Sequence, residues 1–192
     1  HLLVLWHMHP PQSRDPSTGR YILPWTRLHA LKDYWGMVRV LEEFPEMHAT
    51  INVVPSLGAQ LEEYASGKFD EPWFTIAFTP ADKLTPSDKA EILVRGFQVN
   101  RDVMRRWPRY SELFEWSQRA SAEVIARTFG QRDWRDLQFL SQLCWMDEEY
   151  LAADAEVSRL SGKGSDYTEA DKQALRAKQI ELLAKVLPEY RK

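Results

Sequence analysis

Two histidines that flank a single residue, His7 and His9, are the side chains of this sequence best placed to do chemistry. Alternate residues of a strand point to the same face, so we expect both imidazoles to project to one place. Such a pair could bind a metal ion, it could donate hydrogen bonds to substrate hydroxyls, or one ring could bond a buried carbonyl. A metal centre needs further ligands, and the nearby candidates, His29, Asp33 and His48, have no diagnostic spacing.

Other positions could join a site beside this pair. Asn52 stands near the end of a second apolar run, where its amide must find a partner, either a substrate hydroxyl or a neighbouring loop. Trp25 lies on a loop that leads into a predicted helix, so it could stack on a sugar face or hold the start of that helix. His29 and Asp33 are four residues apart and can pair on one helical face.

Two apolar runs supply the strands that would hold these residues. Residues 2–5, continued by Trp6 and bounded by Pro10, suit a strand that is buried on both faces. Residues 50–54 form a second, β-branched strand. In α/β barrels the active site forms at the C-terminal ends of the strands, which is where the two histidines stand.

Helical patterns follow each strand. Apolar residues at spacings of three and four predict a helix over 26–44, which Pro45 ends, and a second helix over 57–65 with Ser56 as its N-cap. A strand, a helix, a strand and a helix in succession require parallel strands through a right-handed crossover. The predicted class is therefore an α/β barrel or a doubly wound sheet.

From residue 71 onward the sequence predicts helices and no strand. Three segments place a threonine three residues before an aspartate, as in a capping box, beginning at Thr79, Thr85 and Thr168. The predicted helices are 87–99, 109–118, 122–128, 133–145 and 169–187. Because two strands alone do not make a stable sheet, we interpret residues 1–70 as the first units of a barrel and residues 71–192 as a helix-rich insertion in, or continuation of, the same domain.

Composition narrows the function. The chain has 192 residues and a formal net charge of −3, which argues against a general nucleic-acid binder and gives no polybasic membrane signal. Its single cysteine, Cys144, lies in an apolar helical stretch and is expected to be a small buried residue. No apolar run reaches the length of a membrane span and no signal peptide precedes the first strand; we expect a cytoplasmic location. No Gly-rich phosphate loop and no serine or cysteine nucleophile motif is found.

Several blocks, in order, resemble glycoside hydrolase family 57, which includes α-amylases, amylopullulanases, 4-α-glucanotransferases and branching enzymes. The resemblance spans nearly the whole chain. Its blocks are residues 5–11 (LWHMHPP), 21–25 (YILPW), 27–34 (RLHALKDY), 52–57 (NVVPSL), 60–64 (QLEEY), 129–137 and 143–147 (LCWMD).

The resemblance implies an incomplete (β/α)7 barrel with helical insertions. The first motif of the family, His-Gln-Pro, falls on His9-Pro10-Pro11, so Pro10 replaces a glutamine and removes both a side-chain amide and a backbone donor. His7 and His9 would be substrate-site residues with Trp25 nearby. Together with Asn52, they are the substrate-binding residues that we predict.

The resemblance also implies a retaining reaction at α-glucosidic bonds, with a Glu nucleophile and an Asp acid/base. In the family both belong to later motifs, so we predict no catalytic residue in this chain, no metal or organic cofactor, an α-glucan as partner and the rest of the barrel downstream. The chain alone is expected to be inactive. Two alternatives stay open: a metal-dependent barrel hydrolase that uses His7 and His9, and a non-catalytic helical or glycan-binding module.

Overall fold

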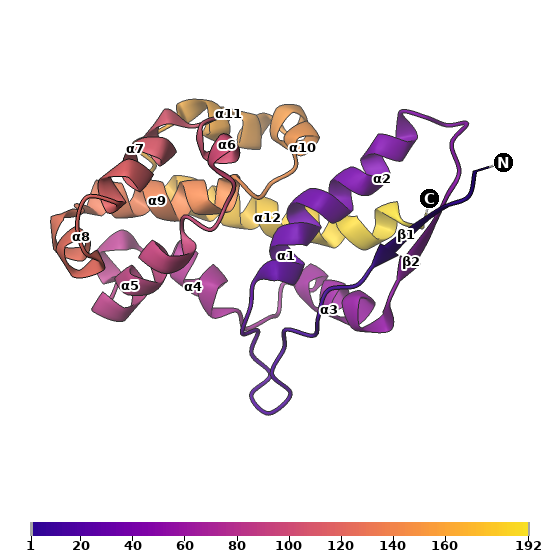
Figure 1. The fold of residues 1–192 in the computed structure, drawn as a ribbon, viewed down its shortest axis with the longest axis horizontal. Coiled ribbons are helices and arrows are strands. Elements are labelled where there is room, and N and C mark those ends of the chain that lie inside the picture. The colour runs from indigo at the N-terminus through magenta and orange to yellow at the C-terminus, as the bar shows by residue number, and fades with distance from the viewer. Residues whose placement is uncertain (1, 192) are drawn as a thin grey trace. The chain divides into compact units, whose positions relative to one another are not determined.

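Two parallel strands stand among helices in the computed structural model, which describes residues 2–191 (Figure 1). Strand β1 (Val4–Met8) pairs with β2 (Ala49–Val53), and His7 lies opposite Asn52 in the register. Both strands and their parallel direction were predicted, with bounds that differ by a few residues. A long crossover separates the two strands, as a parallel pair requires.

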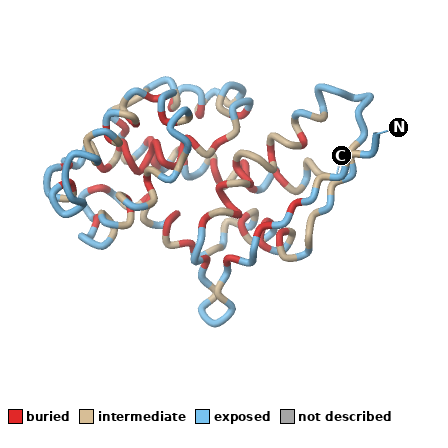
Figure 2. The backbone as a smooth tube through the Cα atoms, viewed as in Figure 1, coloured by how far each residue is buried: buried red, intermediate tan, exposed pale blue. Residues whose placement is uncertain are grey.

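The prediction that the first strand is buried on both faces is wrong for the described chain (Figure 2). Its residues alternate, so that Met8 is 3% exposed whereas Leu5 is 59% exposed. The exposed residues of both strands form one open face of the sheet, which consists of Leu5, His7, Thr50 and Asn52. The prediction failed because the residues of this run are almost all apolar, so hydrophobicity does not distinguish the two faces of the strand. No described segment covers the open face.

The predicted helix over 26–44 is present, but it is not one regular α-helix. Helix α1 (Trp25–His29) continues into a π-helical turn (Ala30–Tyr34) and then into α2 (Trp35–Glu42). A π-turn leaves carbonyls free to accept bonds from outside the helix. Here the backbone N–H of Asp147 donates to the oxygen of Leu31 at 3.0 Å, and the Tyr190 hydroxyl donates to the oxygen of Tyr34 at 2.6 Å.

A glycine beside the π-turn allows this close approach. A Cβ atom on Gly36 would lie 2.7 Å from a carboxylate oxygen of Asp147, so a side chain at this position would displace that carboxylate. The distortion of the helix and the glycine thus accommodate the same neighbouring residue.

The second predicted helix begins two residues earlier than a cap at Ser56 would allow. Helix α3 (Pro55–Ala65) has Val54 as its N-cap and Pro55 at its first position, so the assignment of Ser56 as the cap is wrong. Proline is favoured at this position because its missing N–H would have no partner inside the helix.

The described chain after β2 contains helices joined by turns and loops and no strand, as predicted. The helices after α3 are α4 (Pro72–Phe78), a 3-10 turn (Ala81–Lys83), α5 (Pro86–Arg95), α6 (Arg101–Met104), α7 (Pro108–Ser117), α8 (Ala122–Thr128), α9 (Gln131–Leu143), α10 (Glu148–Ala153), α11 (Ala155–Lys163) and α12 (Glu169–Glu189). The sequence did not predict α4, α6, α10 and α11. These helices have four to nine residues, which is too short for a periodic pattern to be read reliably.

One of the three predicted capping boxes is wrong. Thr79 does not cap a helix; its hydroxyl donates to the Thr75 oxygen at 2.8 Å, at the end of α4. Thr85 forms the predicted reciprocal bonds with Asp88 at the start of α5. Thr168 does the same before α12, where its N–H donates to Asp171 at 2.8 Å and its hydroxyl accepts from the Asp171 N–H at 3.1 Å.

Asp171 makes the stability of the chain depend on pH, with a loss of stability in acid. Burial raises the pKa of this carboxyl, but hydrogen bonds from Lys163 and Thr168 outweigh burial and hold the pKa at about 2. Because the folded pKa lies below the unfolded one, the stabilisation is complete above about pH 4 and is lost as the pH falls toward 2. It amounts to about 2 kcal/mol.

We therefore expect Asp171→Asn to be less stable than the parent chain at neutral pH and to approach it at about pH 2. Urea unfolding at several pH values, followed by circular dichroism, measures this difference. Lys163→Met should reduce the pH dependence, because it removes the cation that lowers the pKa. A difference between Asp171→Asn and the parent that stays constant with pH would contradict the assignment.

The chain divides into two compact units. Unit 1 comprises the chain up to Pro72, Asp147–Glu149 and the chain from Lys178; unit 2 comprises Trp73–Met146 and Tyr150–Ala177. The core of unit 1 gathers around Leu31, Leu57 and Tyr64, each fully buried. In unit 2, nine of the 13 residues of helix α9 are buried. The predicted division at residues 70 and 71 stays a prediction about domain organisation.

Candidate functional site

A hollow of about 590 Å³ lies in unit 1 where β1 ends. We call it the strand-end hollow. It is lined by His7, Met8, His9, Pro10, Pro11, Trp25, His29, Tyr34 and Met37. The lining combines three imidazoles with two larger aromatic rings, and it comes from the strand, the loop after it and the helix that follows.

The strand and its proline boundary place the two histidines. His7 lies on the open face of the sheet, and His9 follows the last residue of β1. Their rings are stacked, with centroids 5.6 Å apart and planes 14° apart. The spacing of one residue therefore brings the two imidazoles together, as the sequence predicted.

Asn52 contacts this pair and does not itself line the hollow. Its side-chain amide nitrogen lies 3.0 Å from Nδ1 of His7, and the two residues are direct partners in the parallel register. An amide nitrogen can only donate, so Nδ1 of His7 is the acceptor. Asn52 thus orients the His7 ring.

Trp25 begins α1 and lines the hollow with a partly buried side chain. The ring centroid of Trp25 lies 6.3 Å from that of His29. Nδ1 of His29 lies 2.5 Å from a carboxylate oxygen of Asp33, which is the pair that their spacing indicated. Both side chains of this pair stay partly exposed.

Tyr34 is a lining residue that the sequence did not indicate. It is five residues after His29, and the two ring centroids are 6.3 Å apart. In an α-helix residues five apart do not share a face, but a π-turn holds more residues and brings them closer. Burial, with the charge of Asp33, raises the pKa of Tyr34, so its hydroxyl stays protonated. A π-turn has no reliable signal in sequence, which is why this residue was missed.

No group of three or more His, Cys, Asp or Glu side chains among residues 2–191 is arranged to hold a metal ion.

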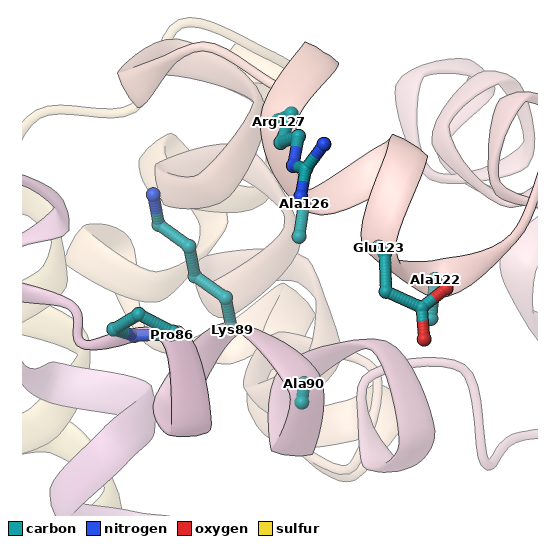
Figure 3. A pocket seen from close by; sticks show the side chains of 7 residues that line it. All are labelled: Pro86, Lys89, Ala90, Ala122, Glu123, Ala126 and Arg127. Atoms are coloured by element: carbon teal, nitrogen blue, oxygen red, sulfur yellow. The ribbon is translucent and has the colours of Figure 1, made fainter.

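A second hollow, of about 470 Å³, lies in unit 2 between α5 and α8 (Figure 3). This hollow is lined by small apolar side chains and by charged side chains of both signs. The lining residues are Pro86, Lys89, Ala90, Ala122, Glu123, Ala126 and Arg127. No aromatic ring lines it. The strand-end hollow, with its rings and imidazoles, is the stronger candidate for a binding site.

Imidazoles and aromatic rings at the carboxyl end of a parallel strand, in a helix-rich α/β chain, form the kind of site found in α/β enzymes. The family model described as glycosyl hydrolase family 57 matches residues 3–185, and the chain belongs to this family. Membership indicates glycoside hydrolase or transglycosidase activity on glycans. No curated protein and no solved structure matches the chain. Across the described part of the chain, no helix combines the length and the apolar character that a membrane crossing needs.

Proposed function

We propose that the chain forms one wall of the substrate site in a retaining, α-glucan-active glycoside hydrolase or transglycosidase. In this proposal residues 1–70 begin an incomplete (β/α)7 barrel and residues 71–192 are its helix-rich insertion. His7, His9, Trp25 and Asn52 are the proposed substrate-binding residues. A cytoplasmic location stays a prediction.

The strand-end hollow is the observation that carries the proposal. Sugar rings present an apolar face and a rim of hydroxyls, so a site for them needs aromatic faces and hydrogen-bonding groups together. Trp25 and Tyr34 supply the faces, and His7 and His9 supply the polar groups at the same hollow. Pro10, which lines the hollow where the family has glutamine, offers no amide, so more of the polar contact falls to the histidines.

The open face of the sheet is an argument for further barrel elements beside β1 and β2. Leu3 and Leu5 are 84% and 59% exposed, and neither strand has a second partner among the described residues. The other face of the sheet is packed, with Met8 buried, whereas this apolar face has no covering element in the described chain. Additional strands beside β1 and β2 would cover this face and close the barrel.

Those additional strands are also the proposed source of the catalytic acids. Retention requires two carboxyl groups about 5–5.5 Å apart, one that attacks and one that acts as acid and then base. None of the nine described residues that line the hollow is Asp or Glu, and Asp33, which contacts the lining residue His29, is engaged in that pair. We therefore assign neither the nucleophile nor the acid/base to this chain.

Titration of the 192-residue chain with maltopentaose, followed by amide NMR shifts, tests the proposal. We expect weak binding that His9→Ala reduces about tenfold, since the substitution removes a hydrogen-bonding ring from the hollow. His48→Ala, at an exposed position outside the hollow, is the matched control. No release of sugar from amylose, maltodextrin or pullulan is expected.

Two results would contradict the proposal. Absence of any maltopentaose-dependent shift near the hollow would remove the glucan site. Hydrolysis of these polymers by the purified chain would show that it holds its own catalytic acids.

A further inference from the structure

We propose that His7 and His29 are fixed in opposite tautomers, so that the strand-end hollow presents a hydrogen-bond donor from one ring and an acceptor from the other to a sugar. This inference rests on the proposed function for its ligand. It makes His29 a substrate-positioning residue and gives Asp33 and Asn52 the role of setting the proton positions.

The tautomer of His29 follows from its partner. Asp33 is a carboxylate and can only accept, so the ring nitrogen 2.5 Å away, Nδ1, carries the proton. In the neutral ring Nε2 then carries a lone pair. His29 lines the hollow, so it brings an acceptor to it.

The tautomer of His7 also follows from its hydrogen-bond partner, and it is the opposite of the His29 tautomer. The partner of its Nδ1, at 3.0 Å, is the amide nitrogen of Asn52, which can only donate. Nδ1 of His7 is therefore the acceptor, and the proton of the neutral ring is on Nε2. The two rings line the same hollow with opposite hydrogen-bonding character.

This arrangement suits adjacent hydroxyls of a glucose ring. Each hydroxyl can donate once and accept, so a wall with one donor and one acceptor can bind two neighbouring hydroxyls that also bond each other. The π-turn contributes by fixing the backbone from Ala30 to Tyr34, which holds Asp33 close to His29. Turns of this type recur at functional sites.

Long-range proton–nitrogen NMR of the ¹⁵N-labelled chain, in mildly alkaline buffer, measures the tautomers directly. We expect a protonated Nδ1 in His29 and a protonated Nε2 in His7. Asp33→Ala should shift His29 toward the Nε2–H form, and Asn52→Ala should weaken the preference of His7. A protonated Nε2 in His29 of the parent chain, or no change in Asp33→Ala, would overturn the inference.

Maltopentaose affinity measures the consequence. His29→Phe keeps an aromatic ring but removes the acceptor, so we expect a loss of about three- to tenfold, the worth of one hydrogen bond. His48→Phe is the matched control and should leave the affinity unchanged. Circular dichroism and the unfolding midpoint report whether His29→Phe folds. Asp33→Ala keeps the imidazole but no longer fixes its tautomer, so part of the population still presents the acceptor and the loss should be smaller.

The two proposals fail in different ways. If the parent chain does not bind maltopentaose, the proposed function fails. If it binds, and His9→Ala weakens binding while His29→Phe does not, the glucan site stands and the role of His29 is overturned.

Discussion

Arg27→Met is expected to destabilise the chain by about 3–5 kcal/mol, because it leaves a carboxylate buried without its cation. The guanidinium of Arg27 and the carboxylate of Glu71 are 0% and 1% exposed. They form two parallel hydrogen bonds, from Nε at 2.9 Å and from Nη2 at 2.8 Å. Nη1 donates to Gln179 at 3.1 Å, and the Tyr64 hydroxyl donates to Glu71 at 2.9 Å.

The cost comes from desolvation rather than from lost attraction. A charge taken out of water is costly unless its partners satisfy it, and methionine fills much of the volume of arginine without a charge. Glu71 would lose both bonds from the guanidinium and keep the bond from the Tyr64 hydroxyl. The substitution should therefore affect unit 1 as a whole, since Arg27 lies in α1 and Tyr64 in α3.

Urea unfolding followed by circular dichroism measures the effect. Arg20→Met is the matched control: Arg20 pairs with Asp70 at 3.0 Å, but both side chains are more than half exposed, so the loss should be about 0–1 kcal/mol. The double variant Arg27→Met/Glu71→Gln should recover part of the loss, because an amide carries no charge. A double variant no more stable than Arg27→Met, or a loss for Arg27→Met no larger than for Arg20→Met, would show that the buried charge is not the cause.

The sequence could not predict this ion pair. Arg27 lies in a segment whose apolar spacing correctly predicted a helix, and the period of that helix is a local property. Its partner Glu71 is 44 residues away, and no pattern in the sequence joins the two. Local periodicity predicts elements, whereas a long-range polar contact depends on how the elements pack.

The residues of the candidate site also fall into two groups: those that local spacing predicted and those that it could not predict. His7 and His9 were predicted to lie together because strand alternation is local, and the spacing of His29 and Asp33 indicated a pair for a similar reason. The contact between His7 and Asn52 depends on the register of two strands separated by the whole crossover. The place of Tyr34 in the lining depends on a π-turn whose Leu31 and Tyr34 carbonyls accept bonds from Asp147 and Tyr190, far along the chain. Both are consequences of tertiary structure.

In unit 2 the largest expected effect comes from Trp134→Ala, at about 3–5 kcal/mol. Trp134 is 1% exposed, and its ring packs edge to face on Phe129 at 5.2 Å, which in turn lies 4.9 Å from the Trp116 ring. The Lys89 ammonium lies 5.6 Å from the centre of the indole. Removal of the indole leaves a cavity at the centre of this aromatic cluster, because a close-packed core relaxes only in part.

Trp134→Phe separates packing from polarity. The indole nitrogen is buried, and no residue of the described chain accepts a hydrogen bond from it. A buried donor without a partner costs about 1–3 kcal/mol, so its loss offsets part of the volume that phenylalanine removes. We expect Trp134→Phe to cost about 1 kcal/mol or less, far below the cost of Trp134→Ala.

Urea unfolding followed by far-ultraviolet circular dichroism measures both variants without relying on tryptophan fluorescence. Equal losses for alanine and phenylalanine would show that the indole nitrogen has an acceptor and that its bond, rather than the ring, stabilises the cluster. Maltopentaose affinity provides an internal check. Every residue that lines the strand-end hollow belongs to unit 1, so a folded Trp134→Phe chain should bind the sugar as the parent does.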